Sequence, residues 1–250
     1  MIFIARALAA FAVASLIFAA PQAQAQAQSF TPEQRKEIEQ VIRDYFIQHP
    51  EMIEELQALA QSAKVKRLIS ENQDSLLHSP RQVTLGNPKG DVTMVEFFDY
   101  NCGYCKRALD DMMTLMKADP NLRVVLKEMP VLSQGSMEAA QVSAAMAMQD
   151  KGGKRFLDFH QKLMMGRGQA DRARAMAAAK EAGADMARLE RDMASPDIRT
   201  ALEESFKLAE AFGIQGTPTY VIGNEVLVGA VGAKELQEKI NMARCGKAAC

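Results

Sequence analysis

The sequence predicts an α/β domain that carries a helical insertion and is preceded by an N-terminal α-helical stalk. Three observations support this fold class. A strand, a helix and a second strand follow one another within Asp91–Glu128, and a β-hairpin follows at Gly216–Val231. Nearly every segment of Ser136–Phe212 has a helical pattern. Two amphipathic helical stretches fill Phe30–Ser79.

The composition is that of an ordinary globular protein. Apolar residues make up 48% of the 250 residues and charged residues 24%, which is enough for a sizeable core. The formal net charge is −1, and no basic run exceeds a few residues. We therefore expect no nucleic-acid partner.

Residues 1–27 predict a cleaved secretory signal peptide. Arg6 supplies one positive charge, an apolar run follows at Ala7–Ala20, and both Ala23-Gln24-Ala25 and Ala25-Gln26-Ala27 fit a cleavage site. An uncleaved membrane anchor is the alternative, but the apolar run is short for a span. We therefore expect export to an oxidising compartment, in which disulfides persist.

Two helices are expected in Phe30–Ser79. Thr31-Pro32-Glu33-Gln34 forms a helix start with a capping box. Pro50 ends the first helix and opens a second one, which we expect to cover Glu51 to about Leu77. The apolar stripes have little within this segment to bury them, so we interpret Phe30–Ser79 as an oligomerisation region. Packing of both helices on the catalytic domain is the alternative.

The remaining residues, 80–250, are expected to form the α/β domain around a βαβ unit. Its elements are a central strand, a helix and a second strand, predicted at Asp91–Tyr100, Lys106–Lys117 and Leu122–Glu128. A short strand at Gln82–Leu85 precedes them. The central strand is apolar on both faces except at Glu96 and Asp99, which is typical of a buried position in a sheet.

Glycines and prolines divide residues 136–212 into about five helices. A run of helices this long does not fit within a compact sheet, so we interpret it as an insertion. The hairpin strands are expected at Gly216–Ile222 and Val226–Val231, and a last helix at Ala233–Ala243.

Cys102-Gly103-Tyr104-Cys105 stands where the central strand gives way to its helix. The first thiol lies at the N-terminal end of that helix, where unpaired N–H groups and the helix dipole favour a thiolate. We predict that Cys102 is an exposed nucleophile and that Cys105 is a more buried resolving thiol. A zinc site or a permanent structural disulfide is the alternative. Zinc normally needs a second close pair of ligands, so we expect no metal and no cofactor.

Cys245 and Cys250 form the second cysteine pair. We expect a structural or regulatory disulfide between them, with metal capture as the alternative. The 16 methionines are spread at helical spacings, which favours a role in filling the core over copper binding.

These motifs resemble those of the thioredoxin superfamily and, within it, the DsbA-like branch of periplasmic thiol–disulfide oxidoreductases. The matching residues are Glu96-Phe97-Phe98 before the cysteine motif and Gly216-Thr217-Pro218-Thr219 late in the chain, and the resemblance covers about Val83–Ala243. It implies a thioredoxin-like fold in which Pro218 is cis and lies against the cysteines. Thr217 and Pro218 would then bind an extended substrate peptide by strand-like addition.

Glu96 matches the buried acid that thioredoxin-like proteins keep beneath the active site. Burial would raise its pKa, so that it could accept and return the proton of the resolving thiol. The alternative is a solvated glutamate at a strand edge.

The residues between the cysteines predict the direction of exchange. DsbA is similar but has a histidine where this chain has Tyr104, whereas Gly103-Tyr104 resembles the dipeptide of the isomerase DsbC. The helices of Phe30–Ser79 resemble those of the ScsC-like branch, in which N-terminal helices drive trimerisation. We therefore favour a homo-oligomeric disulfide isomerase or reductase, because several sites can act on one misfolded chain.

The expected partners are exported proteins that contain cysteines and a membrane redox partner. A monomeric oxidase that donates its disulfide is the first alternative. A copper-binding or scaffolding protein, with Cys102 and Cys105 as copper ligands, is the second.

Overall fold

The computed structural model describes residues 30–250, and the chain divides between Ile53 and Glu54 into two compact units. The predicted signal peptide, residues 1–27, lies outside the described residues. Among residues 30–250, no helix combines the length and apolar character that a membrane span requires.

The first unit contains α1 (Pro32–Gln48). Its N-terminus has the predicted capping box: the Gln34 N–H donates to Thr31 Oγ1 at 3.2 Å, and the Thr31 N–H donates to Gln34 Oε1 at 2.9 Å. No residue of α1 is buried, and the stripe residues Val41 and Ile42 are 68% and 49% exposed. Within its own unit, the apolar stripe of this helix is therefore uncovered.

The next helical region differs from the prediction in one place. The expected single helix is two helices, α2 (Glu51–Glu71) and α3 (Gln73–Leu77). They part at Asn72, whose side-chain amide donates to the Leu68 carbonyl at 2.9 Å. Val65 and Leu76 are buried in the core of the second unit, so this part of the region packs against the sheet.

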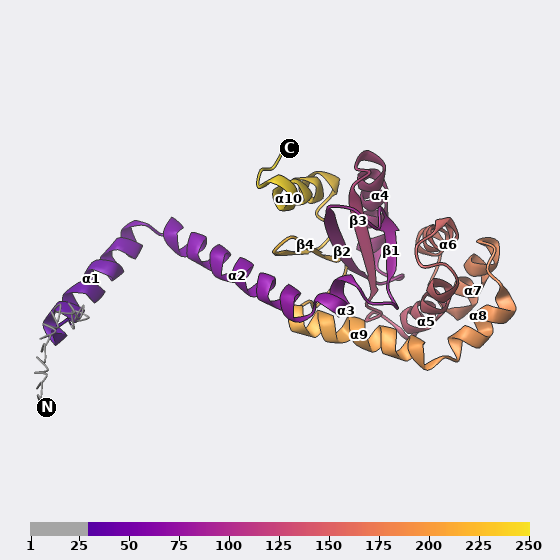
Figure 1. The fold of residues 1–250 in the computed structure, drawn as a ribbon. Helices are drawn as coiled ribbons and strands as arrows, with labels where there is room; N and C mark the ends of the chain where they lie inside the picture. The colour runs from indigo at the N-terminus through magenta and orange to yellow at the C-terminus, as the bar shows by residue number, and fades with distance from the viewer. Residues whose placement is uncertain (1–29) are drawn as a thin grey trace, which may run out of the picture. The chain divides into compact units, whose positions relative to one another are not determined.

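A five-stranded sheet in the order β1-β3-β2-β4-β5 forms the centre of the second unit (Figure 1). Its strands are β1 (Val83–Gly86), β2 (Val92–Phe98), β3 (Leu122–Glu128), β4 (Thr219–Ile222) and β5 (Glu225–Val228). β2 and β3 run parallel, and the other neighbouring pairs run antiparallel. The predicted βαβ unit and hairpin are therefore confirmed, with shorter hairpin strands.

Helices cover both faces of this sheet. They are α4 (Gly103–Ala118), α5 (Gln134–Gln149), α6 (Lys154–Met165), α7 (Arg172–Glu181), α8 (Met186–Met193), α9 (Pro196–Phe212) and α10 (Ala233–Cys245). On β2, Met94 and Phe98 face the core shared with α4 and α10, and Val95 and Phe97 face the core shared with α9. The five helices predicted between residues 136 and 212 are confirmed as α5–α9.

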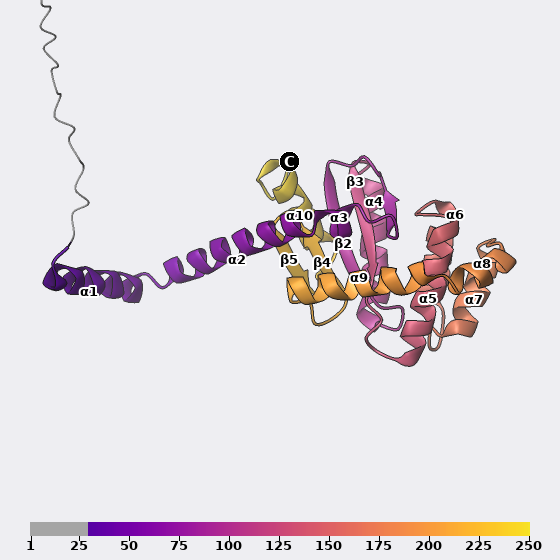
Figure 2. The ribbon, with the colours of Figure 1, turned by 60° about the horizontal axis from the view of Figure 1, so that its bottom comes forward.

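The last of these helices, α9, also packs against the sheet. α5, α6, α7 and α8 pack on one another, whereas α9 continues alongside the sheet (Figure 2). Its residues Leu208, Ala209 and Phe212 pack with the buried side chains of the second face. The run of helices is therefore an insertion that ends in a layer of the α/β domain.

Candidate active site

Cys102 is the N-cap residue of α4 and directly follows the turn after β2. Its N–H donates to the Asp99 carbonyl at 3.0 Å, and its carbonyl accepts from the Lys106 N–H at 3.1 Å. This is the predicted position at a helix N-terminus, where negative charge is favoured.

The prediction that Cys102 is exposed is wrong. Its residue is 5% exposed and that of Cys105 is 1% exposed. The physical reason is a segment that covers the thiol from far along the chain: Cys102 Sγ donates to the Thr217 carbonyl at 3.2 Å. Neither cysteine forms a disulfide in this structure, so the site is in its reduced, dithiol form.

The covering segment is the loop that leads into β4. The Thr217–Pro218 peptide bond is cis, as the resemblance implied. The Pro218 carbonyl accepts from the Gly229 N–H at 2.8 Å, and Thr219 Oγ1 donates to the Gly216 carbonyl at 2.7 Å. The loop is thus held from both sides where it meets Cys102.

Burial sets the protonation state of the second thiol. It raises the pKa of Cys105 well above its ordinary value, against hydrogen bonds to the Asp99 backbone and the Thr217 side chain, which lower it. Glu96 and Cys102 raise the pKa of Cys105 further through charge repulsion. Cys105 therefore keeps its proton until another group removes it.

Glu96 lies in the middle of the sheet, between Leu126 of β3 and Tyr220 of β4. Its residue is 4% exposed, so the alternative of a solvated glutamate at a strand edge is wrong. Burial, with a smaller contribution from the charge of Asp111, raises the pKa of Glu96 to about 8. The Tyr220 hydroxyl is also buried and has no hydrogen-bond partner among the described residues.

The two residues between the cysteines are both exposed. A Cβ placed on Gly103 would meet no heavy atom of the described structure within 4 Å, so packing does not require glycine there. Tyr104 is 59% exposed, and the Arg107 guanidinium carbon lies 4.6 Å from the centre of its ring. This distance is typical of a cation–π contact.

Asp99 contributes to the site in a way that the sequence did not predict. Its residue is 1% exposed, and its carboxylate accepts hydrogen bonds from the N–H groups of Asn101 at 2.8 Å, Val131 at 3.0 Å and Leu132 at 3.1 Å. It therefore joins the cysteine turn to the loop after β3. The only signal in the sequence was a polar residue beside an apolar strand.

Asn101 joins the same turn to the insertion. Its Oδ1 accepts from the Ala170 N–H at 2.7 Å, and its Nδ2 donates to the Ala170 carbonyl at 2.8 Å and to Ser136 Oγ at 3.0 Å. Behind it, the Tyr100 hydroxyl lies 3.0 Å from His160 Nδ1. Burial lowers the pKa of His160 to about 4, so this histidine is neutral.

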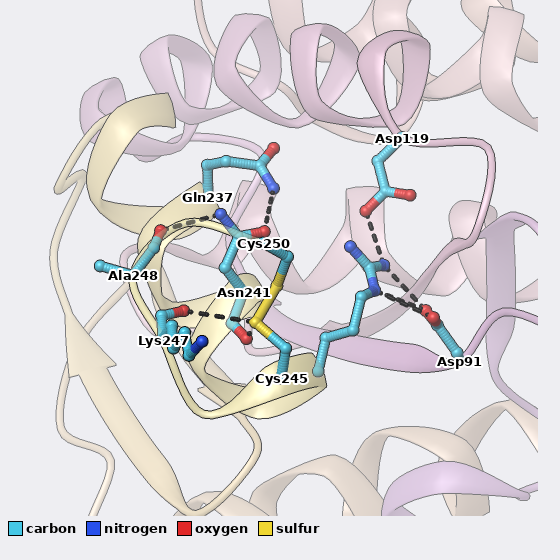
Figure 3. Close-up of a disulfide and its surroundings, with 9 residues drawn as sticks. Asp91, Asp119, Gln237, Asn241, Cys245, Lys247, Ala248 and Cys250 are labelled. Atoms are coloured by element: carbon cyan, nitrogen blue, oxygen red, sulfur yellow. Dashed lines mark hydrogen bonds and ion pairs between the residues drawn. A yellow bond between two sulfur atoms is a disulfide. The ribbon is translucent and has the colours of Figure 1, made fainter.

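The second cysteine pair forms the predicted disulfide, with a Cα–Cα distance of 6.3 Å (Figure 3). The loop that it closes is held by Asn241, whose Nδ2 donates to the Ala248 carbonyl at 2.9 Å. The neighbouring Arg244 forms ion pairs with Asp91 at 2.8 Å and Asp119 at 2.7 Å. Because Asp91 precedes β2 and Cys102 follows it, the disulfide lies at the other end of that strand.

The chain matches the model of one protein family, described as DSBA-like thioredoxin domain, over residues 93–241. A thioredoxin-like oxidoreductase from Silicibacter pomeroyi DSS-3 has 40% sequence identity and a TM-score of 0.65, over 69% of this chain and 98% of that one. A linker-deletion mutant of Proteus mirabilis ScsC has 27% identity and a TM-score of 0.69, over 88% of this chain and 99% of that one.

The curated sequences that the chain resembles are of two kinds, of which one agrees with this family. The thiol:disulfide interchange protein DsbA of Bordetella pertussis is 27% identical over 57% of this chain and 68% of its own length. Na⁺/H⁺ antiporters NhaA from Salinispora arenicola and Herminiimonas arsenicoxydans are 24% and 29% identical over 64% of this chain. The chain spans only 24% and 25% of their lengths.

Proposed function

The chain belongs to the family of DSBA-like thioredoxin domains, and from this premise we propose that it is an exported thiol–disulfide oxidoreductase that acts on protein cysteines. One observation supports this most directly: Cys102 at the start of α4 lies 3.2 Å from the Thr217 carbonyl. This contact brings the nucleophile, the resolving thiol one turn away and the loop of the cis-proline together.

The reaction begins when the Cys102 thiolate attacks a disulfide of the substrate. A bond forms between Cys102 Sγ and one substrate sulfur, the substrate S–S bond breaks, and the second substrate sulfur leaves as a thiolate. The helix N-terminus favours the attacking thiolate. The Thr217 carbonyl, which accepts from the Cys102 thiol in the reduced site, becomes free to accept an N–H from an extended substrate.

Resolution of the mixed disulfide requires Cys105 to lose its proton. The ionised form of Glu96, whose pKa is about 8, accepts this proton, and the Cys105 thiolate then attacks Cys102 Sγ. The enzyme disulfide forms, and the substrate sulfur leaves and takes up the proton. The substrate is thereby reduced by two electrons and the enzyme is oxidised.

Isomerisation uses the same first step without net oxidation. The released substrate thiolate attacks another disulfide of the same chain, and the new thiolate displaces Cys102 from the mixed disulfide. We favour this direction because Tyr104 stands where DsbA has a histidine that stabilises the thiolate. The exposed apolar stripe of α1 supports self-association, which raises the effective concentration of sites.

Two assays with the full chain test the activity and its direction. The expected result is faster recovery of activity from a scrambled disulfide substrate than oxidation of the same substrate in reduced form. A Cys105→Ser variant should accumulate a mixed disulfide with substrate, whereas Cys102→Ser should not. Oxidation alone would favour the monomeric oxidase, and inactivity in both assays would overturn the proposed function.

Self-association is tested with substitutions in α1, because a deletion of Phe30–Ser79 would also remove the core residues Val65 and Leu76. Val41→Lys with Tyr45→Lys, two exposed positions of the apolar stripe, should lower the mass in solution to that of the monomer and abolish isomerisation. The matched control, Gln40→Lys with Ile47→Lys, adds the same charge to exposed positions on the opposite face of α1 and should leave the mass unchanged. A monomeric mass for the unaltered chain would overturn this part of the proposal.

The proposed compartment is the periplasm. A similar structure, 26% identical, is described as a periplasmic thioredoxin-like protein from Salmonella enterica serovar Typhimurium. An isomerase must be kept reduced there, so we propose a membrane protein that supplies electrons to the Cys102–Cys105 couple. Fractionation of cells followed by thiol labelling tests both points: the chain should be periplasmic and its two active-site thiols free.

A further inference from the structure

Three cationic residues lie on the first turns of α4 and on the loop after α6, and we refer to them as the cationic rim: Lys106, Arg107 and Arg167. Lys106 and Arg107 directly follow Cys105 on α4. Lys106 Nζ lies 3.5 Å from the Gly166 carbonyl, which places the α6–α7 loop, and with it Arg167, next to α4. Arg174 holds this loop by donating to the carbonyls of Arg167 and Gly168.

The positive charge of the rim is not neutralised within the described structure. The whole sequence has 30 basic and 31 acidic residues, so this local group of three cations does not reflect an excess of positive charge in the protein. Within residues 30–250, none of its three cations forms an ion pair. The nearest acid along α4, Asp110, lies one turn further from Cys102. The rim therefore presents a positive potential at the entrance to the site.

Apolar side chains are also exposed on the segments that contact α4 or the cysteine turn. Tyr104 stacks with Arg107, and Met165, 55% exposed, precedes the loop that carries Arg167. Val131 and Leu132 are 46% and 55% exposed in the loop tied to Asp99. A segment that reaches the thiols meets apolar and cationic groups together.

We infer that the cationic rim selects substrates whose cysteine lies beside acidic residues and an aromatic or aliphatic residue, in an extended or unfolded segment. This inference rests on the proposed function and specifies its substrate class. The apolar side chains bind the neighbouring large residue, and the rim attracts the acids and orients the segment along α4.

The test compares two peptides in which one cysteine carries a neutral pyridylthio group, so that attack by Cys102 releases a coloured thione. Both peptides have a phenylalanine beside the cysteine, and they differ only in two aspartates or two lysines at the flanking positions. The reduced full chain should react at least about fivefold faster with the acidic peptide at low ionic strength. The ratio should approach one in 0.5 M salt, since exposed charges are screened there.

Charge-reversal variants test whether the preference comes from the rim or from the net charge of the whole protein. Arg107→Glu, alone or together with Arg167→Glu, should abolish or invert the preference for the acidic peptide. Lys117→Glu is the control matched in charge to the single reversal Arg107→Glu, because Lys117 is exposed on α4 about 15 Å along the helix from Arg107. This variant should keep the preference for the acidic peptide.

The outcomes distinguish this inference from the proposed function. Equal rates with the two peptides, or the same loss of preference in the Lys117→Glu variant, would overturn the role of the rim and leave thiol–disulfide exchange intact. Failure of the unaltered chain to react with either peptide would overturn the proposed function itself.

Discussion

The carboxylate of Asp99 accepts a hydrogen bond from the backbone N–H of Leu132, 33 residues further along the chain, at 3.1 Å. The same carboxylate accepts hydrogen bonds from the N–H groups of Asn101 and Val131, and the Asp99 carbonyl accepts from the Cys102 N–H. Asp99 therefore positions the cysteine turn against the loop after β3.

We predict that Asp99→Asn loosens this arrangement. An amide keeps only one oxygen, and its NH₂ group would point at N–H donors, so at least one buried donor loses its partner. The free energy of unfolding should fall by about 1–3 kcal/mol in urea denaturation, and the rate of exchange should fall as well. Asp110→Asn, at an exposed position of α4, is the control and should change stability by less than about 0.5 kcal/mol. Equal effects of the two substitutions would contradict a positioning role for Asp99.

A second prediction concerns the pH dependence introduced by Glu96. Its pKa in the folded chain is about 8, against an ordinary value of 4.5. The folded state therefore holds a proton that the unfolded state has lost, and the contribution to stability, complete below pH 4.5, declines as the pH rises to about 8. A glutamine cannot ionise, so the Glu96→Gln variant should lack the fall in stability with rising pH that Glu96 causes.

The measurement is the difference in the free energy of unfolding between the unaltered chain and Glu96→Gln, taken at pH 5 and at pH 9. This difference should change by roughly 3–5 kcal/mol in favour of the variant at the higher pH. The contribution of Glu128, whose pKa burial also raises to about 8, cancels in the comparison. A difference that does not vary with pH would mean that Glu96 titrates normally.

The third prediction tests the dipeptide. Tyr104→His would place an imidazole beside Cys102, and its protonated form would stabilise the thiolate and hence the reduced enzyme. The exposure of Tyr104 leaves room for the change. We expect a more oxidising couple, by about 30 mV for each ~1.4 kcal/mol of thiolate stabilisation. Equilibration with glutathione redox buffers measures this shift, and Tyr104→Phe should keep the original potential. An unchanged potential in the histidine variant would show that this position does not set the direction of exchange.

The sequence predicted features whose causes are local. β3 begins and ends at the predicted residues, Leu122 and Glu128, and the capping box of α1 forms as expected. Both depend on patterns within a few neighbouring residues.

Features that depend on distant contacts were missed. The burial of Cys102 results from Thr217, 115 residues later. The buried Lys127 on β3 donates a hydrogen bond to the Ser75 carbonyl of α3 and forms an ion pair with Glu204 of α9 at 3.5 Å. No local pattern predicts such partners, because the fold alone brings them together.

The last prediction concerns the disulfide between Cys245 and Cys250. It closes a loop with a sequence separation of 5, for which the loss of chain entropy in the unfolded state gives about 2 kcal/mol as an upper value. The loop is exposed, so the folded chain also gains freedom when the bond is removed. Cys245→Ser with Cys250→Ser should therefore lower the free energy of unfolding by less than about 2 kcal/mol. The exchange rate should stay unchanged, because the seven residues of β2 separate the disulfide from Cys102 by roughly 20 Å. Urea denaturation and the peptide assay measure the two effects. A loss of exchange with stability intact would assign this disulfide a part in the reaction.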